Sequence, residues 1–210
     1  MKPRVCADFF EKFSALYLPF KEQGRGVDLI ERAGIGRDEA RNSDLLAWLL
    51  DCFGDHGQGA AFLRCVMERM GEDGRAFPAG AESLGRYRTR REISYEESDQ
   101  SANQRSRVDV EVDGPGFLLF IEVKIDYRET GDQLQRYLDI VRARAGKRPW
   151  RLAFLTPDGR KPNDVALHGK VVCLRWADLA GDFLRHADVM PSDSHGTVLI
   201  RQFCNHISQL

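Results

Sequence analysis

Two neighbouring stretches decide the fold of this chain: Arg107-Val108-Asp109-Val110-Glu111-Val112 and Phe117-Leu118-Leu119-Phe120-Ile121-Glu122-Val123-Lys124-Ile125. The second stretch has the composition of a buried strand, yet Glu122 and Lys124 interrupt its apolar run. Because successive side chains of a strand point to opposite faces, these two charged residues must share one face. Charges in such a place cost several kcal/mol unless they are paired or bound to a metal. A fold retains them there mainly for chemistry.

A turn separates the two stretches at Asp113-Gly114-Pro115-Gly116, whose residue types are typical of tight turns. If these residues form a simple hairpin loop, Val112 pairs with Phe117. Asp109 then lies opposite Phe120, and without a bulge it shares the face of the charged pair on the second strand. The pattern therefore predicts that acids from both strands converge.

The predicted cluster contains Asp109, Glu122 and Lys124. Two carboxylates about 4 Å apart repel by roughly 4 kcal/mol at an effective dielectric constant of about 20, and one of them would take up a proton. A divalent cation removes this penalty, because hard cations prefer carboxylate oxygens. The cluster is therefore a candidate divalent-metal site. The alternative is a surface aspartate beside an ordinary Glu–Lys ion pair.

The spacing of these residues resembles the PD-(D/E)xK nuclease motif, with Asp109, twelve intervening residues and then Glu122-Val123-Lys124. Val108 stands where the motif has proline, a position that does no chemistry. Downstream, Gln133-Leu134-Gln135-Arg136-Tyr137 resembles the Q-x-x-x-Y motif of RecB-like nucleases. The ordered set is more specific than the short motif alone.

Two further segments resemble an uncharacterised prokaryotic branch of the same superfamily. Glu39 followed by Ser43-Asp44-Leu45-Leu46-Ala47-Trp48-Leu49-Leu50 resembles its first helix. Phe154-Leu155-Thr156-Pro157-Asp158-Gly159 resembles one of its strand ends. Asn42 occupies a position where histidine is expected in many relatives. The resemblance covers roughly residues 31 to 175, most of the chain.

The resemblance implies a Mg²⁺-dependent hydrolase of phosphodiesters, in which Mn²⁺ would be a substitute. Asp109 and Glu122 would bind the ion, and the carbonyl group of Val123 would add a ligand. Lys124 would orient the attacking water or help to deprotonate it, and would offset negative charge on the scissile phosphate.

Three residues outside the hairpin take supporting roles in this interpretation. Periodicity places Glu39 near the core-facing edge of its helix, where it would hold a second ion or a metal water. An acid at a helix start also suits the helix dipole, which is the plainer explanation. Gln133 and Tyr137 are four residues apart and share a helix face. Gln133 would orient the site, and Tyr137 would brace the helix or contact the substrate.

The densest basic run is Arg86-Tyr87-Arg88-Thr89-Arg90-Arg91. Basic side chains with an interleaved aromatic ring suit a nucleic-acid backbone, and a solvated strand entrance explains the same residues equally well. We predict Arg88 and Arg90 as substrate contacts, together with Ser43 on the helix that follows Glu39.

The composition is that of an ordinary soluble protein of 210 residues, with 42% hydrophobic residues, 30% charged residues and a formal net charge of −1. This balance argues against a broad nucleic-acid-coating surface and leaves room for a local one. Five scattered cysteines without a C-x-x-C pair predict free thiols in a reducing compartment. No signal peptide or membrane-length apolar run is evident, so the cytoplasm is the expected location, without membrane contact.

Hydrophobic periodicity predicts one α/β domain over residues 1–210, with a core at about 31–176. The expected fold is a three-layer restriction-endonuclease-like core, αβββαβ, with extra N- and C-terminal helices. The middle strands form an antiparallel meander, and a later strand joins after a crossover helix, so the central sheet should be mixed. The main expected helices lie at 8–20, Arg37–Phe53, Gln133–Ala145 and 176–210.

The two ends of the chain carry their own predictions. The aromatic-rich helix at 8–20 is expected to pack on the domain through one face. The last helix has apolar residues along one face, so it either closes the core or forms a homodimer contact.

The leading functional interpretation is a metal-dependent deoxyribonuclease that acts in defence against foreign DNA or in DNA repair. DNA is the expected partner, with RNA as the alternative, and a partner protein would supply targeting. A second hypothesis is a non-cleaving nucleic-acid-binding or assembly module on a nuclease fold. A third is a hydrolase of a small phosphorylated substrate, although the sequence contains neither G-x-x-x-x-G-K-[ST] nor G-x-G-x-x-G.

Overall fold

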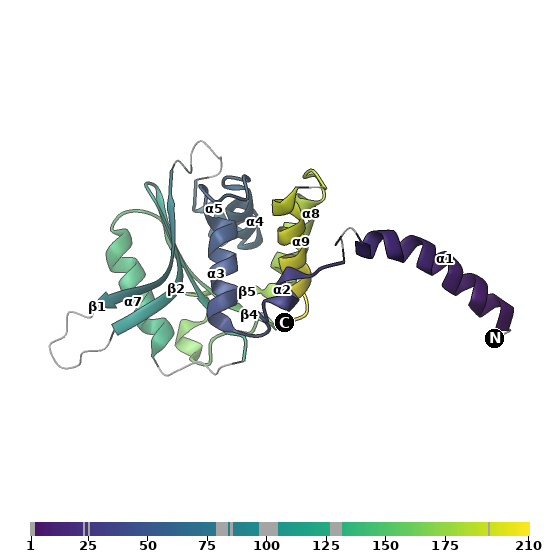
Figure 1. The fold of residues 1–210 in the computed structure, drawn as a ribbon. Helices are drawn as coiled ribbons and strands as arrows, with labels where there is room; N and C mark the ends of the chain where they lie inside the picture. The colour runs from purple at the N-terminus through teal and green to yellow at the C-terminus, as the bar shows by residue number, and fades with distance from the viewer. Residues whose placement is uncertain are drawn as a thin grey trace.

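A computed structural model describes residues 3–22, 24, 26–78, 84, 86–96, 105–126, 132–192 and 194–210. The strands of the described chain are β1 Arg88–Glu96, β2 Arg105–Gly114, β3 Phe117–Val123, β4 Trp150–Thr156 and β5 Val172–Arg175. They form one sheet in the order β1-β2-β3-β4-β5 (Figure 1). The first three strands are antiparallel, whereas β4 and β5 continue the sheet in parallel with β3. The predicted mixed sheet is therefore confirmed.

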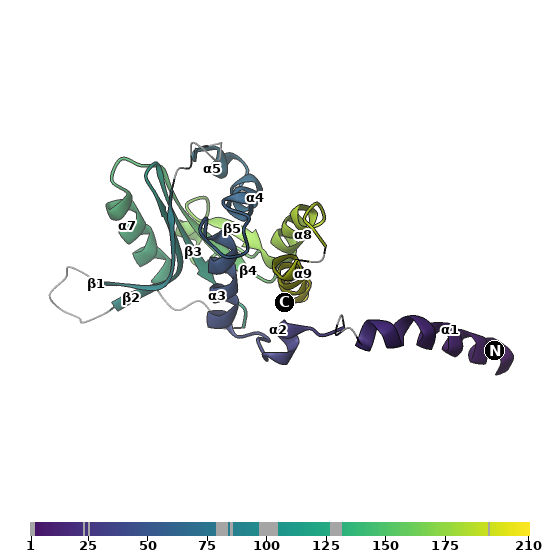
Figure 2. The same cartoon turned by 45° about the horizontal axis from the view of Figure 1, so that its top comes forward.

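Helices cover both faces of this sheet (Figures 1 and 2). The helices within the described residues are α1 Pro3–Glu22, α2 Leu29–Arg32, α3 Glu39–Leu50, α4 Ala61–Arg69, α5 Glu72–Arg75, α7 Gln133–Ala145, α8 Trp176–Ala187 and α9 His195–Ile207, with a 3₁₀ turn η1 Val165–Leu167. The crossover helix α7 packs on one face over Val108, Phe120 and Phe154. The larger core lies on the opposite face, beneath α3, α4, α8 and α9. The predicted three-layer α/β architecture is confirmed.

The hairpin between β2 and β3 is tighter than the sequence suggested. Gly114 belongs to β2 and pairs with Phe117, so only Pro115 and Gly116 form the turn. The close approach requires glycine, since a β-carbon on Gly114 would lie 2.3 Å from a ring carbon of Phe117. The phenyl ring of Phe117 occupies the space that a side chain at position 114 would fill.

This shorter turn shifts the pairing register by two residues. Val112 pairs with Leu119, so the prediction that it pairs with Phe117 is wrong. Phe120 pairs with Glu111, so the prediction that Asp109 lies opposite Phe120 is also wrong. A register shift of one residue would turn every side chain of the strand to the opposite face of the sheet, whereas a shift of two residues leaves each side chain on its original face.

The first core helix is shorter than predicted. α3 ends at Leu50, and Asp51 takes an extended conformation that stops the helix. Phe53, the predicted end of this helix, is 58% exposed and lies in a turn where its backbone N–H donates to the carboxylate of Asp51. The guanidinium of Arg86 covers the Phe53 ring instead.

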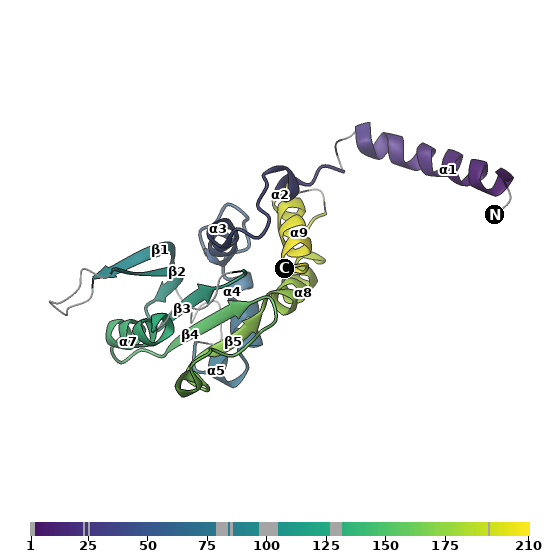
Figure 3. The same ribbon diagram turned by 90° about the horizontal axis from the view of Figure 1, so that it is seen from below.

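The two ends of the chain behave differently. α1 extends away from the sheet and its covering helices in all three views (Figure 3). The expectation that it packs on the domain is wrong, and the aromatic residues that motivated it are exposed. By contrast, α9 closes the core, because Ile200, Phe203 and Ile207 are fully buried. Among the described residues, no helix is both long and apolar enough to cross a membrane.

The Gly114→Ala variant should lower the free energy of unfolding by about 1–3 kcal/mol, the usual range for overpacking. Its β-carbon would press against Phe117, which is itself fully buried. Gly116→Ala is the matched control in the same turn, because its β-carbon would meet only Pro78 at 3.3 Å. Urea unfolding of both variants measures the difference, and equal midpoints would contradict the observed register.

Candidate active site

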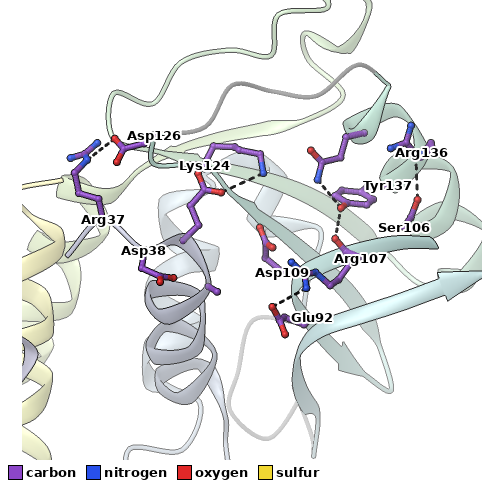
Figure 4. Close-up of a pocket in the computed structure, with 13 residues that line it drawn as sticks. Arg37, Asp38, Glu92, Ser106, Arg107, Asp109, Lys124, Asp126, Arg136 and Tyr137 are labelled. Carbon is purple, nitrogen blue, oxygen red and sulfur yellow. Dashed lines mark hydrogen bonds and ion pairs between the residues drawn. The ribbon is translucent and has the colours of Figure 1, made fainter. Parts of the chain in front are cut away.

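Asp109 of β2, Glu122 of β3 and Lys124, which directly follows β3, form a charged cluster at one end of the sheet. Figure 4 shows Asp109 and Lys124 among the residues that line the adjoining pocket. The Lys124 ammonium lies 2.7 Å from Oε1 of Glu122. Asp109 is fixed from the neighbouring strand, since its Oδ2 accepts a hydrogen bond of 2.8 Å from the backbone N–H of Val123. Glu122 is 1% exposed and Lys124 is 9% exposed, so the cluster is largely removed from water.

An irregularity in the sheet places Asp109 at this point. Val108 packs in the core beneath α7, whereas Val110 packs in the core on the opposite face. Residues two apart on a regular strand share a face, so the alternation of β2 is interrupted between them, at Asp109. The pairing of β1 with β2 is interrupted at the same level, opposite Glu92.

Glu92 has the backbone conformation that accounts for the interruption. Its φ angle is 48°, and it is the one non-glycine residue of the described chain with positive φ. Such a conformation is unfavourable for a residue with a side chain and often occurs near functional sites. The Glu92 carboxylate forms exposed ion pairs with Arg91 and Arg107. We find no sequence pattern that would have identified this residue.

The start of α3 brings a third acid to the cluster. Glu39 is the first residue of the helix, and Asp38 caps it by accepting from the backbone N–H of Arg41. One oxygen of Glu39 accepts 2.7 Å from the backbone N–H of Ile125, and the other lies 3.6 Å from the ammonium of Lys124. The helix start is thereby attached to the end of β3.

The start of α7 supplies the next contacts. The side-chain amide of Gln133 donates to Oε1 of Glu122 and to the hydroxyl of Tyr137, each at 2.8 Å. Tyr137 in turn donates to the backbone carbonyl of Arg107 on β2. Gln133 and Tyr137 therefore connect the acid on β3 with the strand that carries Asp109.

A pocket of about 670 Å³ opens over this cluster. Besides Asp109, Lys124, Gln133 and Tyr137, its lining contains cationic residues that sequence reasoning missed. They come from three separated segments: Arg37, Arg107 and Arg136. Arg37 also links two distant segments to the start of α3. Its guanidinium forms an ion pair of 2.6 Å with Asp126 and donates a hydrogen bond of 2.6 Å to the backbone carbonyl of Leu210. No local pattern in the sequence could show that these arginines meet.

Three predicted substrate contacts lie elsewhere. Arg88, Arg90 and Ser43 are absent from the pocket lining. Arg90 forms an ion pair with the fully buried Glu111, so its charge already has a partner, and Ser43 is 2% exposed inside α3. Tyr87, the aromatic residue of the basic run, is also buried in the core. Only the exposed Arg88 retains the surface position expected for it.

The electrostatics of the cluster are those of crowded carboxylates. Burial, and then the nearby charge of Asp109, raises the pKa of Glu122 well above its ordinary value. Burial raises the pKa of Asp109 too, although the Val123 N–H opposes the shift. Burial alone would lower the pKa of Lys124, but Glu122, Glu39 and Asp109 outweigh it and raise that pKa. Lys124 therefore remains a cation.

The pair of acids on β2 and β3 fits a hard divalent cation. Oε2 of Glu122 is buried and has no hydrogen-bond partner among the described residues. An oxygen of this kind is costly unless a cation or donor meets it. The described residues contain no group of three His, Cys, Asp or Glu side chains arranged to hold a metal, and Lys124 contacts both Glu39 and Glu122. Mg²⁺ commonly uses only one or two carboxylates and keeps several waters, so Asp109 and Glu122 have the ligand chemistry that this ion uses.

The fold and this carboxylate–lysine centre together define an α/β protein of nuclease type. A family model of the PD-(D/E)XK nuclease superfamily matches residues 27–205, and the chain belongs to this superfamily. Searches of curated proteins and of solved structures found no significant match. Membership suggests nuclease activity. The matched residues leave out α1, the helix that extends away from the sheet.

The raised pKa of Glu122 predicts a pH-dependent stability. In the metal-free protein the folded state holds the Glu122 proton more tightly than the unfolded chain does. The free energy of unfolding should therefore fall as pH rises above the ordinary value of 4.5. Glu122→Gln removes this titration, so its stability should decline less over the same interval. Urea unfolding in EDTA at several pH values measures both slopes, and parallel slopes would contradict the assignment.

Proposed function

We propose that this chain is a Mg²⁺-dependent deoxyribonuclease that hydrolyses phosphodiester bonds. One observation carries the proposal: the buried Glu122, with an oxygen that lacks a donor, lies beside Asp109 and the cation of Lys124. A purely structural role would favour a fully paired or apolar arrangement, because an unsatisfied buried carboxylate lowers stability. Bound Mg²⁺ would neutralise the acids and polarise a phosphate oxygen, and Mn²⁺ would substitute for it.

Each side chain of the cluster has a defined task in this proposal. Asp109 and Glu122 hold the cation, with the Val123 carbonyl as a further ligand and Glu39 as the acid for a second ion or its water. Lys124, which its three acidic neighbours keep charged, offsets negative charge on the scissile phosphate and orients the attacking water. Gln133 orients Glu122 through its 2.8 Å hydrogen bond, and Tyr137 fixes Gln133.

The pocket lining offers three arginines to a polyanionic substrate, beside the acids Asp38, Glu39, Glu92 and Asp126. Arg37, just before α3, pairs with Asp126, and Arg107 on β2 pairs with Glu92 (Figure 4). Arg136 on α7 donates to Ser106, and all three arginines line the pocket. Arginine forks match phosphate oxygens, and several phosphates in succession distinguish a nucleic acid from a small phosphorylated compound. We favour DNA over RNA, in defence or repair, with a partner protein for targeting.

A non-cleaving nucleic-acid-binding module is the second candidate. Such a module has no need of a complete catalytic set, yet both acids and the lysine are present here. Lys124 lies 2.7 Å from Glu122, and Asp109 accepts from the backbone N–H of Val123 between them. Their presence favours the enzyme.

Cleavage of supercoiled plasmid, linear duplex and single-stranded DNA tests the proposal. Each substrate is incubated with Mg²⁺, with Mn²⁺ and with EDTA. Wild type should cleave at least one DNA form only with metal. Lys124→Ala should abolish turnover, because the phosphate charge then has no adjacent ammonium.

Lys124→Met is the companion variant, since it removes the charge but keeps most of the apolar stem and the packing around it. Lys170→Ala removes an exposed lysine before β5 and should cleave at the wild-type rate. Circular dichroism and thermal unfolding verify that each variant is folded. Wild-type turnover by the Lys124 variants would exclude the mechanism, and metal-independent cleavage would exclude the cofactor.

A further inference from the structure

α1 carries an apolar stripe that the described part of the chain leaves uncovered. At about 100° of rotation per residue, six side chains fall on one side of this helix. Phe9, Phe13 and Tyr17 stack along it, with successive ring centroids 6.1 Å and 5.3 Å apart. The full stripe, each member of which is between 43% and 79% exposed, is Phe9, Phe10, Phe13, Leu16, Tyr17 and Phe20.

A stripe of this size calls for a covering surface. Soluble proteins expose single apolar side chains routinely, but a contiguous patch marks an interaction site. Elsewhere in the described chain, Val27 and Leu29 lie beside Gln202, one turn of α9 from Val198. Phe53, Val165 and Val189 are exposed on separate segments. They offer α1 no comparable patch within its own chain. The matching apolar surface that the chain does provide is the same stripe on another copy.

We propose that this protein forms a homodimer in which the α1 stripe of one copy packs against the α1 stripe of the second. The contact is isologous, so each copy contributes the same residues to a closed interface. The proposal depends on α1 alone and is independent of the nuclease chemistry. It also explains how an aromatic-rich helix that contacts so little of its own chain is kept out of water.

The area of the stripe is sufficient for a stable dimer. The exposed fractions of its six members together equal between three and four whole side chains. Large aromatic side chains bury about 150–250 Å² each, which gives roughly 700 Å² per copy and roughly 1,400 Å² in total. Specific interfaces bury about 1,200–2,000 Å² in total. The stripe alone therefore reaches the usual range.

The charges of α1 favour a protein partner over a lipid surface. Helices that lie on membranes have a polar face rich in Lys and Arg, which attracts anionic headgroups. Between Phe9 and Glu22 the charged residues of α1 are Glu11, Lys12, Lys21 and Glu22. Acidic and basic residues balance, so this segment gains no net attraction to an anionic membrane and carries no net self-repulsion in a dimer.

Light scattering after gel filtration of the full chain, over a series of protein concentrations, tests the proposal. The expected mass is that of two chains of 23.9 kDa each. Leu16→Ala removes a member of the stripe and should raise the dissociation constant of the dimer at least about tenfold. Phe13→Ala combined with Tyr17→Ala should yield a monomer. Alanine preserves helix propensity, so α1 itself is retained.

Leu18→Ala is the matched control. Leu18 is 52% exposed on the same helix but lies on the side opposite the stripe, so this variant should leave the dimer unchanged. Flotation with vesicles of anionic phospholipid is the companion measurement. A wild-type monomer at every concentration, equal effects of the two leucine variants, or vesicle binding by a monomer would each overturn the proposal. Cleavage activity enters none of these outcomes.

Discussion

The burial of Glu122 beside Asp109 is the constraint on which this structure depends. A second buried acid in the same sheet, Glu111, shows the contrast. Glu111 is fully buried but accepts from Tyr95 and pairs with Arg90 and Arg144, so its charge is compensated within the protein. Oε1 of Glu122 accepts a hydrogen bond from Gln133 and forms an ion pair with Lys124. Oε2 of Glu122 has no hydrogen-bond partner among the described residues. The paired Glu111 therefore contributes to stability. The unpaired oxygen of Glu122 leaves a site where a cation can bind.

The surrounding elements hold this arrangement in place. α3 presents Glu39 to the end of β3, and α7 presents Gln133 to Glu122. The interruption of β2 at Asp109, opposite the strained Glu92, directs one acid toward the other strand. Strain of this kind costs about 1–3 kcal/mol and persists only where the surrounding structure imposes it. The packing of the helices on the sheet therefore offsets the free-energy cost of the strained Glu92 and of the buried acids.

Much of this could be predicted from the sequence, and the failures have physical causes. Strand alternation correctly placed Glu122 and Lys124 together, and the D…ExK spacing correctly added Asp109. The sequence did not show that Asp109 lies there through an interruption of β2 opposite Glu92. The crossover helix was placed correctly by its hydrophobic period. Composition could not show that Arg90 would be neutralised by Glu111, nor that arginines from three segments would line one pocket. Periodicity showed that α1 is amphipathic, but it says nothing about which surface covers the apolar face.

Direct titration of Mn²⁺ binding, followed by the electron paramagnetic resonance signal of the free ion, tests the central claim. Wild type should bind Mn²⁺ saturably, Mg²⁺ should compete, and Glu122→Gln should lose most of the affinity because it removes a ligand charge. Glu111→Gln is the control, since its carboxylate is already paired with arginines, and it should bind as wild type does. Equal binding by wild type and Glu122→Gln, or no binding by folded wild type, would contradict the account.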